Sequence, residues 1–193
     1  MKPQILSVVI LFALNAWAGP KEDAAAFHDQ LEYSKELQII RPLAANGVAW
    51  AQGSLGYLHH ISLGVKQDYK EALKWYKLSA MQGDAVGQRG LGALYQHGDA
   101  VVQDYVESLK WYKLAAAQGN VDAQTSLGDM YLSGMGEAQD FVRAHMWFNI
   151  AAINGYPYPA RQRDEIAKKM DSSQVAKAQR LARECQERKF KGC

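Results

Sequence analysis

The sequence predicts an all-α fold, a right-handed α/α solenoid of stacked helix pairs. Three stretches resemble one another: DYKEALKWYKLSAMQGDA starts at residue 68, DYVESLKWYKLAAAQGNV at 104 and DFVRAHMWFNIAAINGYP at 140. The copies follow at an unchanged spacing of 36 residues, with no insertion or deletion. A unit of this length forms two helices that cannot bury an apolar face alone, so successive units must stack against one another.

Each copy is expected to contain two helices, in repeats at 48–83, 84–119 and 120–155. The first helices are predicted at roughly 48–60, 84–97 and 120–133. The second helix starts at a recurring Asp, whose carboxylate accepts from the free N–H groups of the first turn. It ends at a Gly, which supplies a left-handed stop. The recurring structural residues are Asp68, Asp104 and Asp140; Gly83, Gly119 and Gly155; Gly56, Gly92 and Gly128; and Trp75, Trp111 and Trp147.

The recurring residues suggest how each copy packs. Glu71 and Glu107 stand three residues after the Asp and complete a capping-box pattern, but Arg143 replaces this Glu in the third copy. That helix start should therefore be less well fixed. A Leu precedes Gly56 and its equivalents, so a neighbouring helix can approach closely there. The recurring Trp is expected to serve packing first, because its side chain can bury about 150–250 Å².

The N-terminal residues 1–18 have the layout of a signal peptide. Lys2 is followed by an apolar run and by the small-x-small site Ala16-Trp17-Ala18. The mature chain is expected to begin at Gly19 and to be exported, to the periplasm or out of the cell. An uncleaved N-terminal anchor is the alternative. No later stretch reaches the roughly 18 apolar residues of a membrane-spanning helix.

Both ends of the array are expected to carry caps. Residues 19–47 contain a degenerate half-repeat, in which Pro42 should bend or interrupt the helix. Residues 156–193 are expected to form two capping helices, Ala160–Met170 and Ser173–Gln186, after a Tyr-Pro-Tyr-Pro break. Ser172 or Ser173 is expected to cap the second of them. Cys185 and Cys193 are the two cysteines of the chain, and in an exported protein they predict one local disulfide, with free thiols as the alternative.

Charge gives no strong preference for a partner. The formal net charge is +2, although the stretch from Arg161 to Cys193 holds ten Lys and Arg against five Asp and Glu. Because acids are interspersed, this basic tail is interpreted as a solvated helix face, with contact to an anionic surface as the alternative. The repeats carry no basic stripe, so nucleic acid is not an expected partner.

The chain contains no S-x-x-K, G-x-S-x-G or H-E-x-x-H motif. No catalytic residue, cofactor or metal site is therefore expected. His59 occupies the position of Tyr95 and Tyr131 in the other copies, and we interpret it as filling part of the tyrosine's space. A metal role for His59 and His60 is disfavoured because no acidic or cysteine partner recurs at ligand spacing.

The pattern L-G-x-x-Y, then D-[YF]-x-x-[AS]-x-x-W-[YF]-x-x-[AS]-A-x-x-G, resembles the Sel1-like repeat, a relative of the tetratricopeptide repeat. The resemblance covers about residues 32–155, and the C-terminal helices also resemble those that close many bacterial proteins of this kind. Ser62 departs from the pattern, since Gly98 and Gly134 stand at its position in the other copies. The resemblance implies an α/α solenoid that mediates protein–protein contacts, in envelope processes or host interaction.

The function expected from the sequence is an exported scaffold that binds a protein or peptide without catalysis. The alternative is a β-lactam- or peptidoglycan-directed hydrolase or binding protein, as in a cysteine-rich branch of the family. This sequence lacks the cysteine pair in each repeat that defines that branch.

The candidate partner contacts lie on the first helices, at positions that vary between the copies. Those of the first copy form an aromatic pair and those of the third a carboxylate pair, which would give a concave groove of graded polarity for an extended or helical peptide. The alternative is that Trp50 and Tyr57 pack beneath the degenerate helix. The candidate contact residues are Trp50, Ser54, Tyr57, Arg89, Asp122 and Asp129.

Overall fold

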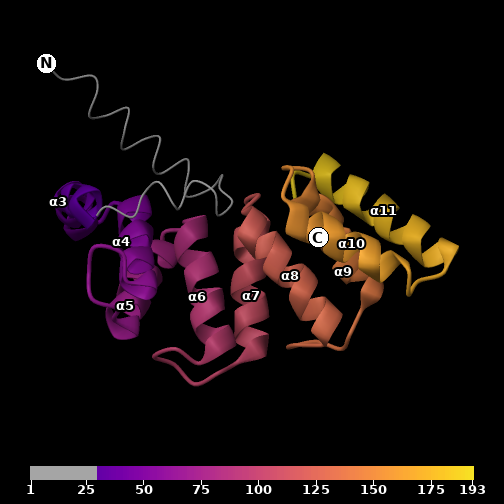
Figure 1. Ribbon diagram of the computed structural model, residues 1–193, viewed down its shortest axis with the longest axis horizontal. Coiled ribbons are helices and arrows are strands. Elements are labelled where there is room, and N and C mark those ends of the chain that lie inside the picture. Colours follow the sequence, from indigo (N-terminus) through magenta and orange to yellow (C-terminus); the bar gives the residue numbers. More distant parts are fainter. Residues whose placement is uncertain (1–29) are drawn as a thin grey trace, which may run out of the picture. The chain divides into compact units, whose positions relative to one another are not determined.

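The computed structural model describes residues 30–193, so the expected signal peptide and the start of the N-terminal cap lie outside the described residues. Every regular element in this described part is an α-helix, as the sequence predicted. The chain divides into two compact units, residues 1–90 and 91–193, and the division falls within α6. Figure 1 shows the helices, which are α3 (Gln30–Ala45), α4 (Ala49–Ile61), α5 (Tyr69–Met81), α6 (Ala85–His97), α7 (Tyr105–Ala116), α8 (Val121–Ser133), α9 (Phe141–Ala152), α10 (Pro157–Ala167) and α11 (Ser172–Glu187).

The recurring Asp residues cap α5, α7 and α9. The Asp68 carboxylate accepts from the backbone N–H groups of two residues in the first turn of α5, and Asp104 does the same for α7. Asp140 accepts only from the Arg143 N–H, in line with the weaker start expected for the third copy. The second half of the predicted capping box is not formed: the Asp68 N–H donates to the His59 carbonyl, and the Glu71 carboxylate pairs with Lys74.

Each second helix ends two or three residues before the glycine that the sequence indicated. Gly83, Gly119 and Gly155 have φ of 84°, 84° and 82°, the left-handed region in which a side chain is strained. Ser62 adopts the same region at the end of α4, with φ of 64°, where the other copies have glycine. The first copy therefore carries backbone strain at Ser62, and the second carries it at Ala100, which has φ of 59° where the other copies have Gly64 and Gly136.

The glycine of each Leu-Gly pair lies directly against an aromatic ring of the following helix. A Cβ added at Gly56 would lie 2.7 Å from the Tyr76 ring, and Gly92 and Gly128 have the same relation to Tyr112 and Phe148. The side chains of these three aromatic residues are fully or almost fully buried. The close approach is thus made by the second helix of the same copy.

The recurring tryptophans are buried to different extents. Trp75 and Trp111 are only half-buried, whereas the aromatic residue that follows each of them is buried. Trp147 is buried, and it belongs to α9, against which α10 and α11 pack. The helix face directed at the glycine is centred one residue after the tryptophan. The ring of Tyr76, Tyr112 or Phe148 therefore fills the space beside the glycine.

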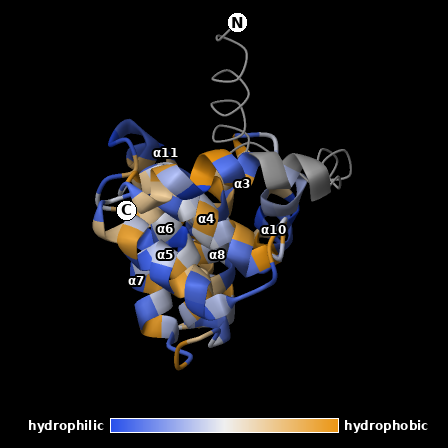
Figure 2. Cartoon of the chain, turned by 90° about the vertical axis from the view of Figure 1, so that its left-hand side faces the viewer, coloured by the Kyte–Doolittle hydropathy of each residue, from blue (hydrophilic) through white to orange (hydrophobic). Residues whose placement is uncertain are grey.

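In unit 1, α3 covers α4 through one hydrophobic cluster, formed by Leu37, Ile40, Ala44, Ala51, Leu55 and Leu58. Pro42 does not interrupt α3, which continues to Ala45. The proline lacks the N–H that would bond to the carbonyl four residues earlier, but its own carbonyl still accepts from the Asn46 N–H at 3.0 Å. Figure 2 shows hydrophobic and hydrophilic residues interleaved along α4 and α5, as amphipathic helices require.

In unit 2, both capping helices begin earlier than predicted. Helix α10 starts at Pro157 rather than Ala160, because a proline in the first turn gives up only an N–H that has no helical partner. Helix α11 starts at Ser172, and its N-cap is Asp171 rather than a serine. The Asp171 carboxylate accepts from the Gln174 N–H, and the Gln174 side chain completes a capping box.

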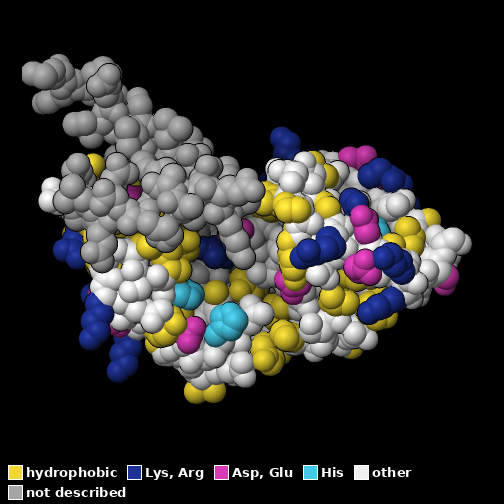
Figure 3. Space-filling model, viewed as in Figure 1, with side chains coloured by type: hydrophobic (Ala, Val, Ile, Leu, Met, Phe, Trp, Pro, Cys, Tyr) yellow, Lys and Arg dark blue, Asp and Glu magenta, His cyan; other side chains and the backbone are white. Residues whose placement is uncertain are grey.

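Cys185 and Cys193 form the disulfide that the sequence predicted. Lys and Arg alternate with Asp and Glu on the visible face over α10 and α11 (Figure 3). In the described part of the chain, no helix is both long enough and apolar enough to cross a membrane.

Candidate functional site

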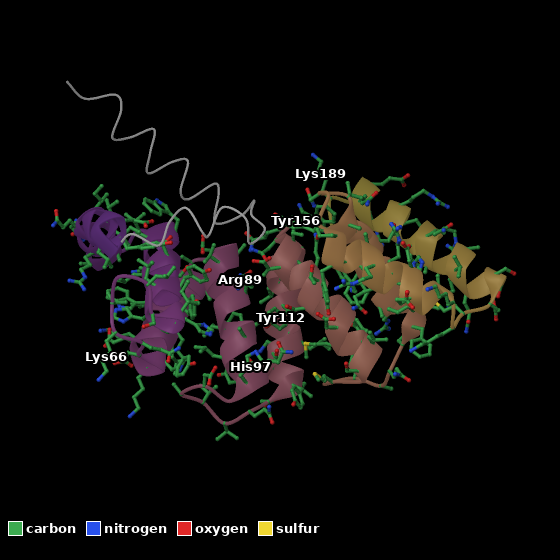
Figure 4. All side chains as sticks on the ribbon, in the orientation of Figure 1. Lys66, Arg89, His97, Tyr112, Tyr156 and Lys189 are labelled. Atoms are coloured by element: carbon green, nitrogen blue, oxygen red, sulfur yellow. A yellow bond between two sulfur atoms is a disulfide. The ribbon has the colours of Figure 1, made fainter. Side chains whose placement is uncertain are left out.

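The candidate contact residues of unit 1 lie on α4 and α6. Trp50, Ser54 and Tyr57 are half-buried on one side of α4. Trp50 packs against the hydrophobic cluster that α3 and α4 share, which is the packing alternative stated for it. Tyr57 lies beneath Arg89 of α6, whose guanidinium carbon is 5.5 Å from the centre of the tyrosine ring. Arg89 projects from α6 in Figure 4. The pair presents a cation stacked on an aromatic face, an arrangement worth about 0.5–1 kcal/mol at exposed sites.

The candidate carboxylates of unit 2 both lie on α8, and each meets a tyrosine of the Tyr-Pro-Tyr-Pro stretch. The Tyr158 hydroxyl donates to the Asp129 carboxylate at 2.8 Å. Burial raises the pKa of Asp129, although the bond from Tyr158 acts in the opposite direction. Burial and the same carboxylate raise the pKa of Tyr158 to about 12. Asp129 is therefore a sheltered, hydrogen-bonded carboxylate.

Asp122 is exposed, about two turns before Asp129 on α8. Its charge adds to burial in raising the pKa of Tyr156, which precedes α10. On the other side of this surface, the Arg161 guanidinium carbon lies 5.9 Å from the centre of the Tyr158 ring. We refer to Asp122, Asp129, Tyr156, Tyr158 and Arg161 as the acid–tyrosine cluster.

Sequence reasoning missed the tyrosines and the arginine of this cluster. The Tyr-Pro-Tyr-Pro stretch breaks the repeat pattern, and nothing in its local sequence indicates that it returns to α8. The spacing of Asp122 and Asp129 placed them on one helix, but only the packing of α10 reveals which tyrosines lie beside them.

A second ionic cluster in unit 2 lies at the connection between α8 and α9. The Glu137 carboxylate accepts from Lys113 at 2.6 Å and from Arg143 at 2.7 Å, and these bonds, led by that from Lys113, lower the pKa of Glu137. The Tyr131 ring lies 5.8 Å from Lys113 and 5.3 Å from Arg143. These ion pairs join α7 to the loop after α8, so their role is structural.

His59 and His145 each carry a buried ring nitrogen. Within residues 30–193, the Nδ1 atoms of His59 and His145 are buried and have no hydrogen-bond partner. The same part of the chain contains no group of three His, Cys, Asp or Glu residues placed to hold a metal ion. His59 is half-buried, as expected for a residue that fills part of the tyrosine's space.

Comparison with known proteins gives a family for the repeats. The model of the Sel1 repeat matches residues 51–84, 85–120 and 121–156, a continuous stretch of more than half the chain. No curated protein matches the chain.

Two solved structures are similar. The crystal structure of c5321, described as a protective antigen present in uropathogenic Escherichia coli strains and displaying an SLR fold, is 29% identical with a TM-score of 0.73. That comparison covers 80% of this chain but only 34% of the antigen, so the chain spans about a third of its length. A Sel1 repeat protein from Oxalobacter formigenes is 32% identical with a TM-score of 0.58, and the match covers 68% of this chain and 98% of that protein.

The helix pairs, the recurring Asp caps and the glycine stops occur in the same three copies that the family model matches. The chain belongs to the Sel1 repeat family.

Proposed function

We propose that this protein is an exported scaffold that binds a protein or peptide partner without catalysing a reaction. The observation that carries the proposal is the contrast between recurring and varying positions on the first helices. The recurring Leu55, Leu91 and Leu127 are all buried. Packing alone accounts for them.

The varying positions are at least partly exposed and differ in chemistry. Tyr57 and Asp129 stand at equivalent positions, 72 residues apart, and both are half-buried. Asp122 is exposed, whereas the equivalent Trp50 is half-buried. Because the residues at these positions differ between the copies, each copy presents a different chemistry there.

Two surfaces support the proposal, one in each unit. In unit 1 the Tyr57–Arg89 pair offers an aromatic face with a cation, and both residue types are enriched where proteins make energetically important contacts. In unit 2 the acid–tyrosine cluster offers carboxylates with phenol groups. Tyr158 is 40% exposed, although its hydroxyl is bonded to Asp129. An amphipathic ring of this kind is suited to a protein contact.

Export is supported by the cysteine chemistry together with the N-terminal signal pattern. The single disulfide joins residues eight positions apart, and such bonds persist in oxidising compartments outside the cytoplasm. Subcellular fractionation of cells that express the full chain, with mass measurement of its N-terminus, tests this part. We expect an extracytoplasmic product that begins at Gly19, and a cytoplasmic product of full mass would contradict export.

The hydrolase alternative is not proposed. It depended on a branch of the family with a cysteine pair in each repeat, whereas both cysteines here belong to the C-terminal disulfide.

Affinity capture tests the binding function. Residues 19–193 serve as bait in an envelope extract, and the captured protein is purified and titrated by calorimetry. We expect Tyr57→Ala/Arg89→Ala or Asp122→Asn/Asp129→Asn to weaken its binding about tenfold or more. The matched control is Lys74→Ala/Lys110→Ala, which changes exposed charges on the second helices, and circular dichroism verifies that each variant is folded. If neither double substitution weakens binding more than the control, these surfaces do not bind the partner.

A further inference from the structure

The chain after α11 contains a backbone conformation that a side chain disfavours. Lys189 and Phe190 both have positive φ, 51° and 64°, and neither is glycine. Two consecutive residues of this kind are costly and persist only when surrounding contacts hold them. Contacts with the rest of the chain must therefore hold this loop, Arg188–Cys193.

Two bonds return the loop to Cys185, which is fully buried on α11. The Phe190 N–H donates to the Cys185 carbonyl at 2.8 Å. The disulfide then joins Cys193 to the same residue, with 5.6 Å between their Cα atoms. The loop is thus fastened to Cys185 at Phe190 and again at Cys193.

The closed loop places Phe190 over the turn between α7 and α8. A Cβ added at Gly119 would lie 3.3 Å from the Cε2 atom of Phe190. The equivalent turn glycines, Gly83 and Gly155, have no atom within 4 Å of the same point. The aromatic cover is therefore specific to this turn, which is far from the C-terminus in sequence.

The neighbours of Phe190 do not share its contact. Lys189 and Lys191 are exposed, whereas Phe190 is half-buried. Lys189 projects away from the helices in Figure 4. The left-handed pair turns the chain so that the single apolar side chain of the loop faces the turn.

We propose that the Cys185–Cys193 disulfide is a redox-sensitive clamp that holds Phe190 against the Gly119 turn and fastens the C-terminal cap to the second repeat. A dithiol reductant would open it: the dithiol transfers two electrons and two protons, its sulfurs join as a disulfide, and Cys185 and Cys193 become thiols. Without the closure, the strained pair relaxes and Phe190 leaves the turn. The device is independent of the proposed partner binding.

Hydrogen exchange measured by mass spectrometry tests the clamp. The amides of Gly119 and Asn120 report on the covered turn, since they donate to Ala116 and Ala115. In the chain treated with dithiothreitol, and in Cys185→Ala/Cys193→Ala, we expect these amides to exchange about tenfold faster or more. The amides of Gly83 and Asp84, which make the same bonds in an uncovered turn, are the internal control and should not change.

The role of Phe190 is tested by a coupled comparison. In the oxidised chain, Phe190→Ala should accelerate exchange at the Gly119 turn as much as reduction does, and reduction of this variant should add little. Lys191→Ala, in the same loop, should leave exchange at the turn unchanged. The proposal is overturned if reduction leaves exchange at the turn as it was, if Phe190→Ala has no effect, or if reduction accelerates exchange evenly across α7–α11.

Discussion

Replacing Gly128 by alanine should destabilise this protein, although the same change in an ordinary helix stabilises. Alanine has a helix propensity about 1 kcal/mol more favourable than glycine. At Gly128, however, the new methyl group would lie 2.7 Å from two ring atoms of Phe148, against ordinary contact at 3.4 Å or more. The ring or the helix would have to move by about 0.7 Å, the difference between these two distances.

The surroundings of Phe148 oppose that movement. Its side chain is fully buried, and its ring also makes an edge contact with Tyr158, at 6.3 Å between ring centres. Overpacking in a close-packed core costs about 1–3 kcal/mol. Subtracting the gain in helix propensity leaves a net loss of about 1 kcal/mol, which lowers Tm by about 2–4 °C in a chain of this size.

Thermal unfolding followed by circular dichroism measures the effect. Ser126→Ala on the same helix is the control, because it improves helix propensity without the overlap. In a Phe148→Leu background the ring is gone, so Gly128→Ala should become neutral or stabilising. If Gly128→Ala raises Tm in the wild-type background, the ring does not restrict this position and the packing argument fails.

The remaining predictions concern a strained turn, the helix caps and a buried histidine. Ser62→Gly should raise stability by about 1 kcal/mol because glycine tolerates the φ of 64° at no steric cost, and an unchanged denaturant midpoint would contradict this. Asp68→Ala should cost about 0.5–2 kcal/mol and more than Asp140→Ala, because Asp68 accepts two hydrogen bonds and Asp140 one; equal losses in urea unfolding would refute the ranking. Burial lowers the pKa of His145 below 6.5, so the unfolded chain binds its proton more readily and stability should fall as pH drops through that value. His145→Gln should reduce the difference in Tm between pH 7.5 and 5, and a difference as large as in the wild type would exclude this histidine as its source.

The local features of each repeat could be read from the sequence because neighbours in the chain determine them. Asp68 caps α5 by accepting from residues two and three positions later, and Gly83 ends it through its own backbone freedom. The same reasoning located the first helices to within one residue. It failed at Asp171, where an acidic residue just ahead of two serines made the cap.

Contacts between distant residues were not readable in this way. The two aromatic residues Trp75 and Tyr76 are adjacent, and only the packing of α5 on Gly56 decides that the tyrosine is the buried one. The sequence places Asp129 in a carboxylate pair on α8, and only the packing of α10 brings the Tyr158 hydroxyl to donate to it. A rotation of one residue about a helix axis, about 100°, changes which side chain faces the neighbour.

The sequence by itself determined the period, the helix pairs, their caps and stops, and the disulfide between its two cysteines. The tertiary structure alone decided which aromatic fills each interhelical space, how the acid–tyrosine cluster is assembled, and that Phe190 covers the Gly119 turn. The physical reason is the sequence separation over which each kind of interaction acts. The backbone hydrogen bonds within a helix and its caps act within four residues, whereas burial depends on atoms that the chain brings together only on folding.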